Sequence, residues 1–170
     1  PNEPLGDMYA PVEFGRGGIR YNGSQCTRGG GSLYVEVTGE ILLDGTIASD
    51  GSYDQYCGGG SGGSIWINTD VLRGTGTVKA NGANGGYRYN QGGGSGGRVA
   101  VYYNDASLFG LGNVYAIGGS QGGSAQDGAA GTVYIKDNTL AEEQAIVRID
   151  NGGNSGSVGY TVIDKVALQK

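Results

Sequence analysis

The side chains of this chain that could do chemistry are carboxylates, tyrosines and two cysteines, because the sequence contains no histidine. Without histidine the chain lacks the commonest general base, the Ser-His-Asp triad and most zinc sites. Two cysteines are also too few for a metal site built from cysteine alone. The remaining chemistry is that of oxygen ligands, aromatic rings and two cysteines.

Three carboxylates lie close together in the sequence, at Asp44, Asp50 and Asp54. Oxygen ligands from Asp50 and Asp54, together with backbone carbonyls, could hold Ca²⁺. No Asp-x-Asp-x-Asp-Gly loop is present, and the alternative for each acid is a turn residue or an ion-pair partner. No pair of acids can be assigned to one face, so we expect the protein not to be an enzyme.

Aromatic residues are the stronger lead to function, because several of the 12 tyrosines fall in glycine-rich segments outside the strand-like ones. Rows of Tyr and Trp suit sugar rings, since the aromatic face packs on C–H groups while polar neighbours bond the hydroxyls. The candidate ligand-binding residues are Tyr53, Tyr56, Trp66, Tyr87, Arg88, Tyr89 and Asn90, with Asn84 and Gln91 as further polar groups. The alternative is an aromatic ladder that stabilises stacked strands and binds nothing.

A repeat positions these residues. Four glycines, Gly31, Gly63, Gly97 and Gly131, each open an apolar run, and they are spaced 32, 34 and 34 residues apart. A near-constant step of this size is typical of stacked repeats. The expected first strands are 31–37, 63–67, 97–103 and 131–136, and the second strands are 45–48, 76–80, 112–116 and 146–149.

The repeat predicts an all-β, right-handed parallel β-solenoid of about four coils of about 34 residues, with glycine-rich return segments. An antiparallel sandwich also fits the strands, but they are joined by longer segments than a tight hairpin turn. Non-strand positions also recur at the repeat step, which stacking explains and hairpins do not. Alternation directs inward Leu33 and Val35, Ile65 and Ile67, Val99 and Val101, and Val133 and Ile135.

Stacking also predicts which side chains meet between coils. Asp44 should lie beside Arg73 as an ion pair, and Tyr21, Tyr53 and Tyr87 should form a column at one edge. Tyr34, Trp66 and Tyr134 should share an outward position, with Ala100 filling the gap. The corner pairs Asp50-Gly51, Asn81-Gly82, Gly118-Gly119 and Asn151-Gly152 should form left-handed turns.

The two cysteines, Cys26 and Cys57, lie 31 residues apart, which is close to one repeat. Stacking could bring them to neighbouring positions, so we expect a disulfide, with two free buried thiols as the alternative. A disulfide in a chain poor in lysine and free of histidine favours an oxidising, extracellular setting.

Composition excludes other classes of partner. The net charge is −5 and no basic stretch is present, so we expect no nucleic-acid partner. No apolar stretch approaches the roughly 20 residues of a membrane span, so we expect no membrane insertion. The chain is expected to be one module, excised or processed from a larger protein. Residues 1–27 would form a cap or partial coil, residues 28–156 the repeats, and residues 157–170 a last strand.

Three segments carry a resemblance to known proteins: Gly-Gly-Gly-Ser-Gly-Gly-Ser-Ile-Trp-Ile (58–67), Leu-Arg-Gly-Thr-Gly-Thr-Val-Lys-Ala-Asn-Gly (72–82) and Gly-Gly-Gly-Ser-Gly-Gly-Arg-Val-Ala-Val-Tyr-Tyr (92–103). They resemble glycine-rich β-helical repeats of large secreted or cell-surface proteins, including adhesin-like ones. The resemblance implies an extracellular, modular location and carries no catalytic motif.

We therefore expect a non-catalytic module of a surface protein, located outside the cell, that has a structural role or binds a polysaccharide or cell-surface glycan, next to neighbouring domains of a larger chain. The alternatives are a carbohydrate-binding module of a secreted polysaccharide-degrading enzyme and a β-helical polysaccharide lyase or hydrolase. No cofactor is expected apart from the possible Ca²⁺.

Overall fold

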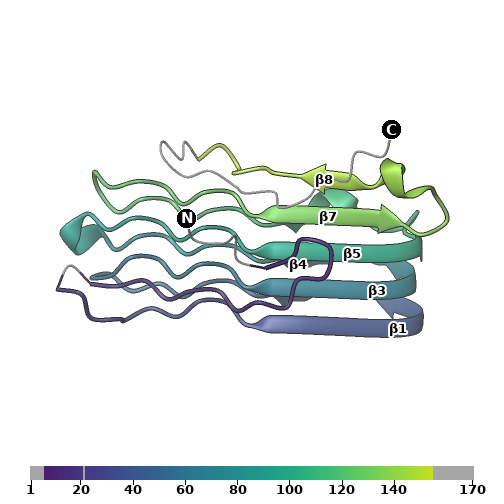
Figure 1. Cartoon of the computed structure of the whole chain (residues 1–170), viewed down its shortest axis with the longest axis horizontal. Helices are drawn as coiled ribbons and strands as arrows, with labels where there is room; N and C mark the ends of the chain where they lie inside the picture. Colours follow the sequence, from purple (N-terminus) through teal and green to yellow (C-terminus); the bar gives the residue numbers. More distant parts are fainter. Residues whose placement is uncertain (1–5, 21, 155–170) are drawn as a thin grey trace.

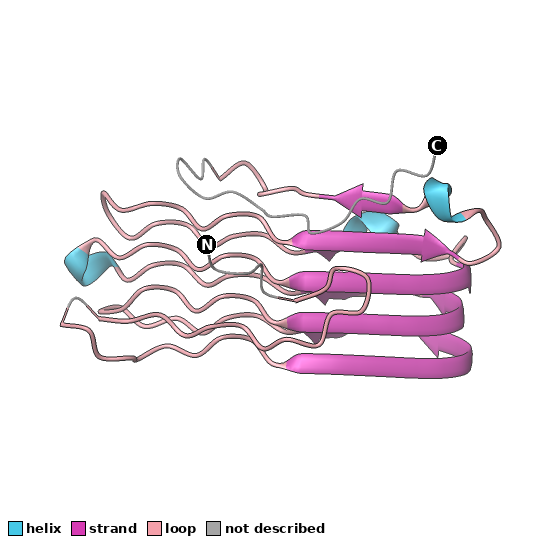
Figure 2. Cartoon of the chain, viewed as in Figure 1, coloured by secondary structure: helices cyan, strands magenta, loops and turns pink. Residues whose placement is uncertain are grey.

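A computed structural model describes residues 6–20 and 22–154 of the chain. Two stacked β-sheets form one half of the molecule, and glycine-rich segments form the other half (Figures 1 and 2). The five-stranded sheet has the order β1(Ser32–Leu42), β3(Ser64–Arg73), β5(Arg98–Asp105), β7(Thr132–Asp137) and β8(Ile146–Arg148). The three-stranded sheet contains β2(Thr46–Ala48), β4(Thr77–Lys79) and β6(Val114–Tyr115). The short 3-10 turns are η1(Tyr87–Tyr89), η2(Leu111–Asn113) and η3(Glu142–Gln144).

The chain is an all-β solenoid, as the repeat predicts, with coils of about 34 residues but about three turns instead of four. Strands β1, β3, β5 and β7 are parallel and in register, so that Val35 pairs with Ile67, Ile67 with Val101, and Val101 with Ile135. The inward side chains of β3, β5 and β7 are buried, which confirms the predicted alternation. Leu33 of β1 is 39% exposed, since none of the described coils covers that end.

Within residues 6–20 and 22–154 the last coil is not completed, and the expected assignment of residues 146–149 to the second sheet is wrong. Strand β8 pairs antiparallel with β7 at the edge of the first sheet, with Tyr134 opposite Val147. The buried Lys136 ammonium donates to the carbonyls of Asp137, Leu140 and Ala141, at 3.0, 2.6 and 2.9 Å. These bonds hold the loop that reverses the chain and bring β8 back along β7.

Arg148 compensates for the strand that the second sheet lacks. Its guanidinium donates to the carbonyl oxygens of Leu111 and Val114, at 3.1 and 3.0 Å, next to β6. A side chain thus satisfies acceptors that a further stacked strand would otherwise use.

The glycine-rich half forms ordered, wavy layers beside the sheets (Figure 1). The N–H groups of Gly59 and Gly62 donate to carbonyls of the next coil, while those of Gly60 and Gly63 donate to the facing layer. This three-residue hydrogen-bonding period is that of the polyproline II helix. A Cβ on Gly62 would clash with the Ala80 carbonyl, so the layers can approach this closely only through glycine.

Side chains hold the corners between strands and glycine-rich segments, and three of the four predicted corner pairs form no left-handed turn. Asp50 Oδ1 accepts from the Asn81 N–H at 2.8 Å, and Asn81 Oδ1 accepts from the Ile117 N–H at 2.9 Å. Asn151 Oδ1 accepts from the Gly118 N–H at 2.8 Å. Of the glycines in the four predicted corner pairs, Gly152 alone has a positive φ.

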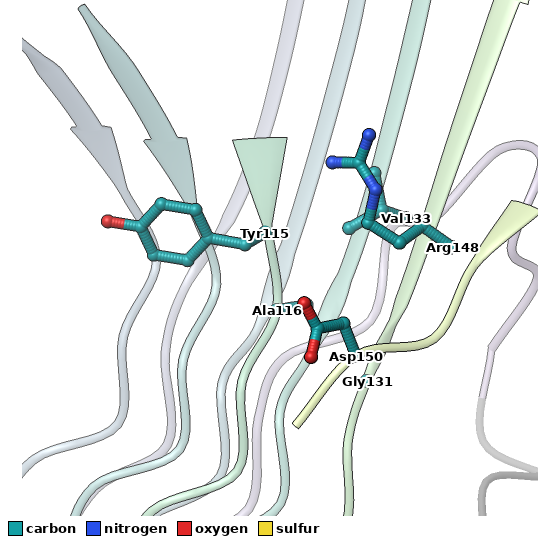
Figure 3. Close-up of a pocket in the computed structure, with 6 residues that line it drawn as sticks. All are labelled: Tyr115, Ala116, Gly131, Val133, Arg148 and Asp150. Atoms are coloured by element: carbon teal, nitrogen blue, oxygen red, sulfur yellow. The ribbon is translucent and has the colours of Figure 1, made fainter. Parts of the chain in front are cut away.

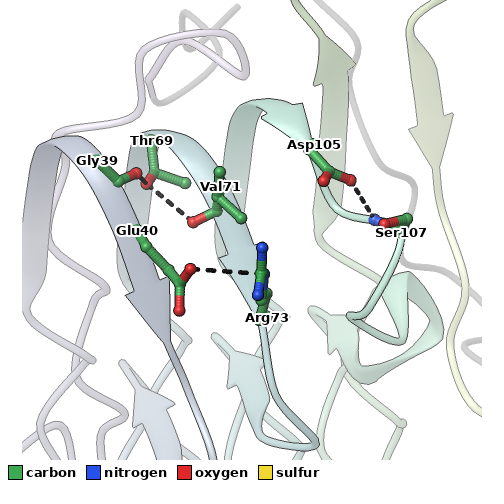
Figure 4. Close-up of polar contacts among 7 residues, drawn as sticks. All are labelled: Gly39, Glu40, Thr69, Val71, Arg73, Asp105 and Ser107. Carbon is green, nitrogen blue, oxygen red and sulfur yellow. Dashed lines mark hydrogen bonds and ion pairs between the residues drawn. The ribbon is translucent and has the colours of Figure 1, made fainter.

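The predicted ion pair between Asp44 and Arg73 does not form. Arg73 Nε lies 3.5 Å from Glu40 Oε2 (Figure 4), and Asp44 Oδ1 accepts from the N–H and hydroxyl of Thr75 at 3.1 and 3.3 Å. The reason is the register of the second sheet, in which Thr46 pairs with Thr77. Asp44 is thereby placed opposite Thr75, two residues beyond Arg73.

The N-terminal segment packs on the outside of the solenoid. The Ser64 hydroxyl donates to the Glu13 carbonyl and the Tyr102 hydroxyl donates to the Tyr9 carbonyl, so this segment crosses the outer face of the first sheet. Farther on, the carbonyls of Arg16 and Ile19 accept from Ser61 and Gly58, which adds a third layer to the glycine-rich half. The predicted last strand, 157–170, lies outside the described residues.

Candidate functional site

The aromatic residues singled out in the sequence occupy two separate places. The tip cluster, at the far end of the glycine-rich half, consists of Arg20, Tyr56, Tyr87, Arg88 and Tyr89, which the contacts below involve, and of Tyr53, which we include because it lies three residues before Tyr56 in the chain. The outer ladder, on the first sheet, consists of Tyr9, Tyr34, Trp66, Tyr102 and Tyr134. Trp66 is therefore not part of the site formed by the other candidate residues.

Backbone contacts between neighbouring coils position the tip cluster. The Arg88 N–H donates to the Gln55 carbonyl at 3.1 Å, and the Gly86 N–H donates to the Cys57 carbonyl at 2.8 Å. Asn90 ends η1 in the left-handed conformation with φ 52°, which asparagine tolerates better than most residues. These contacts place the Tyr87–Tyr89 turn next to residues 55–57 of the preceding coil.

A disulfide links Cys26 and Cys57 next to the tip cluster, as the spacing of the cysteines predicts. Their Cα atoms are 6.3 Å apart and Cys57 is buried. Arg20 forms an antiparallel bridge with Cys57. The disulfide thus links the N-terminal layer to the return segment between β2 and β3, beside Tyr56.

The rings of the tip cluster combine open faces with cationic neighbours. Tyr56 and Tyr89 have centroids 6.1 Å apart, and the Arg20 guanidinium lies 5.4 Å from the Tyr56 centroid. The Arg88 guanidinium lies 5.1 Å from the Tyr87 centroid. The exposed fractions of Tyr53, Tyr87 and Tyr89 are 54%, 56% and 48%. Flat apolar faces beside guanidinium donors can contact a polyhydroxylated ligand.

The ring contacts differ from the expected column. The column needs Tyr53 against Tyr87, but the contact found among the described rings at this edge joins Tyr56 to Tyr89. The Tyr87 hydroxyl donates to Gln55 Oε1 at 2.9 Å. Tyr21 lies outside the described residues.

The outer ladder is continuous along the first sheet. The centroid distances are 4.5 Å for Tyr34–Trp66, 6.5 Å for Trp66–Tyr102 and 5.5 Å for Tyr102–Tyr134. Tyr102 fills the space that Ala100 leaves between Trp66 and Tyr134. Tyr102 is not among the predicted residues, although its position two residues beyond Ala100 places it on the same face.

The N-terminal segment covers much of the outer ladder. Tyr9 packs edge-on against Tyr134 at 4.9 Å, and Tyr134 is 3% exposed. Burial raises the pKa of Tyr102, and the nearby Tyr134 and Asp7 raise it further. Only Tyr34, 47% exposed, is open at the end of the row. These contacts favour a structural role for the ladder.

The two aspartates predicted to bind Ca²⁺ are engaged by protein groups. Asp50 Oδ2 lies 2.7 Å from Lys79 Nζ, and this hydrogen bond raises the pKa of Lys79. Asp54 Oδ1 accepts from the Tyr56 N–H at 2.8 Å. Among described residues, Cys26, Asp54 and Cys57 are the one group with ligand atoms close enough for a metal, and the disulfide occupies both sulfurs. Ca²⁺ binding therefore stays a prediction.

Outside the two aromatic groups, the structure shows a small depression and an aspartate with a lowered pKa. A depression between the two sheets is lined by Tyr115, Ala116, Gly131, Val133, Arg148 and Asp150 (Figure 3). It has no enclosed space for even a water molecule, whereas typical ligand pockets enclose roughly 300–1,000 Å³. Asp105, near the bend of β5, accepts from Ser107, and this bond lowers its pKa (Figure 4).

Comparison with known proteins adds no family to these observations. No protein-family model, no curated protein and no solved structure matches the chain. None of the helices in the described part of the chain is long and apolar enough to cross a membrane. The resemblance to glycine-rich surface proteins is supported in its coarser part, the β-solenoid fold.

Proposed function

We propose that this chain is a non-catalytic, extracellular module of a larger surface protein and that it binds glycans through the tip cluster. The single observation that carries the proposal is the exposure of three tyrosine rings, Tyr53, Tyr87 and Tyr89, at one end of a rigid scaffold. Large aromatic side chains are usually buried, so a group of open rings indicates a contact surface.

The surroundings of these rings suit a sugar better than an apolar ligand. Guanidinium groups of Arg20 and Arg88 stack on Tyr56 and Tyr87 and can donate to hydroxyl groups at their edges. Because η1 is held by backbone bonds to the preceding coil, the rings lose little freedom on binding.

The disulfide supports the location. It indicates an oxidising, non-cytoplasmic compartment, because thiols in the cytosol are kept reduced. Placement outside the cell, on a surface protein, is the step that we propose beyond this.

A carbohydrate-binding module of a secreted polysaccharide-degrading enzyme would use the same tip cluster. A catalytic lyase or hydrolase remains the less favoured alternative, and release of oligosaccharide from a polysaccharide by the isolated chain would establish it. A purely structural module would bind no glycan.

The test is a glycan array and polysaccharide pull-down with the wild type and with Tyr87→Ala and Tyr89→Ala. We expect the wild type to bind at least one glycan class, and each variant to bind it about tenfold or more weakly, since stacked rings carry much of such contacts. The matched control is Phe14→Ala, which removes a ring that is 74% exposed but lies outside the tip cluster. Equal loss in the control, or no binding by the wild type, would reject the proposal.

A further inference from the structure

The first coil leaves one end of the solenoid open. Ile65 and Ile67 of β3 are fully buried, whereas Leu33 and Val35, at the equivalent positions of β1, are exposed and half-buried. In the described residues β1 is the terminal strand of its sheet. The inward side chains of β1 therefore form an apolar surface along the outer edge of this strand, opposite the edge that pairs with β3.

The backbone of β1 is free on its outer side. The Gly31 carbonyl accepts from the Ser64 N–H at 2.9 Å, and the Leu43 N–H donates to the Arg73 carbonyl at 2.8 Å. Odd-numbered residues of this strand thus direct their N–H and C=O groups toward β3. Even-numbered residues, including Tyr34 and Glu36, direct theirs toward the open edge, as strand geometry requires.

The straight part of this edge is the segment 32–38. The register with β3 shifts between Val37 and Glu40, and the strand curls over at Gly39 (Figure 4). Within the described residues, the start of the segment that precedes β1 lies on the outer face and not at this edge, since Gly6 lies beside Arg98 of β5. At the other end of the sheet, β7 is covered by the antiparallel strand β8.

We propose that a second copy of the chain covers this edge, through antiparallel pairing of segments 32–38 about a two-fold axis at Val35. Such an interface is isologous, with the same segment on both sides. The apolar face then pairs Leu33 with the partner's Val37 and Val35 with the partner's Val35. The even-numbered residues exchange the backbone hydrogen bonds that the edge leaves unmade.

Charge and overlap select this register among those that keep the apolar face inward. Moving the two-fold axis to Glu36, which slides the partner by two residues, sets Glu36 opposite the partner's Glu36, which is unfavourable. Moving the axis to Tyr34 sets Tyr34 opposite the partner's Tyr34, and either move leaves only five residues of the segment paired. The proposed register pairs all seven residues and sets Tyr34 opposite the partner's Glu36, on the outward face.

Opposite charges at Tyr34 test the pairing directly. Tyr34→Glu would set two like-charge pairs across the interface, and Tyr34→Lys would set two opposite-charge pairs. Both variants lose the same ring, its contact with Trp66 and its hydrogen bond to Glu36 of the same strand. Because each new charge also faces that Glu36, the circular dichroism of both monomers is compared as the fold control. In sedimentation equilibrium over a range of concentrations, we expect a dimer for the wild type. The dissociation constant should be about tenfold or more higher for Tyr34→Glu than for Tyr34→Lys.

A second variant tests the backbone contribution. Glu36→Pro removes an N–H that faces the open edge and none that faces β3, so it should leave the coil folded and abolish the dimer. Circular dichroism and quantitation of the disulfide check the fold. A wild type that stays monomeric at all concentrations would overturn the proposal and leave the edge to another part of a longer chain. Equal dimerisation of the two Tyr34 variants would overturn the register.

Discussion

Tyr102 shows how a single residue joins two parts of the chain that are far apart in sequence. Its ring completes the outer ladder between Trp66 and Tyr134, and its hydroxyl donates to the Tyr9 carbonyl at 2.8 Å. The N-terminal segment is thus held to the first sheet by a tyrosine in its neutral form.

We expect Tyr102 to make the stability depend on alkaline pH. Because the folded state raises its pKa, the contribution is fully present below the unfolded pKa of about 10 and is lost as the pH rises toward the folded value. Tyr102→Phe should cost about 1 kcal/mol at pH 7, through the lost hydrogen bond. In urea unfolding, the difference in unfolding free energy between the wild type and Tyr102→Phe should become smaller between about pH 10 and pH 12. A gap that stays constant over that range would contradict the assignment.

Contacts between single residues were the least predictable part of the molecule. The cysteine pairing followed from a spacing close to one repeat, and the structure confirms it. The Asp44–Arg73 pair failed because a shift of two residues in the corner suffices to change a partner, and loop lengths there vary between coils. The exposed tyrosines of the tip could be recognised from their glycine-rich surroundings, but their ring contacts could not.

At the scale of the elements, strand alternation was predictable because it depends only on local sequence. The six residues of β3, β5 and β7 that alternation predicts to point inward are all buried: Ile65, Ile67, Val99, Val101, Val133 and Ile135. The reversal of β8 was not predictable from its own sequence, since it depends on the absence of a further coil and on Lys136 closing the loop. The polyproline II layers could not be predicted, because a glycine run has no side-chain pattern that indicates its backbone conformation.

The glycine-rich layers yield a test at this scale. A Cβ on Gly94 would clash with the Gly60 carbonyl, so Gly94→Ala should destabilise the fold by about 1–3 kcal/mol or more. Gly112 has open space around its Cα and no positive φ, so Gly112→Ala should be neutral or stabilising by about 0.4–1 kcal/mol. Urea unfolding of the two variants measures the difference. Similar stability of both would mean that the layers are not closely packed.

At the scale of the whole molecule, the disulfide joins the N-terminal layer to the stacked coils. It closes a loop with a sequence separation of 31 residues. The loop-entropy estimate for that length is about 3–4 kcal/mol.

The double variant Cys26→Ser/Cys57→Ser should therefore unfold at lower denaturant, with a loss of about 3–4 kcal/mol. Guanidinium unfolding of the variant and of the reduced wild type, side by side with the oxidised wild type, measures it. Reduced wild type and variant should agree with each other. Unchanged stability in both would show that the N-terminal layer is held by its backbone bonds alone.

The division of the solenoid into a glycine-packed half and a tip also bears on how such a protein can change over evolution. The layers are held by main-chain hydrogen bonds and exclude side chains, so mutations there are mostly rejected. Tyr53, Tyr87 and Tyr89 are exposed, and the contacts of Tyr87 and Tyr89 with Gln55, Tyr56 and Arg88 lie within the tip and not within the layers. A lineage of these proteins could therefore diversify the tips rapidly, as immune receptors diversify loops, while the coils behind them stay constant.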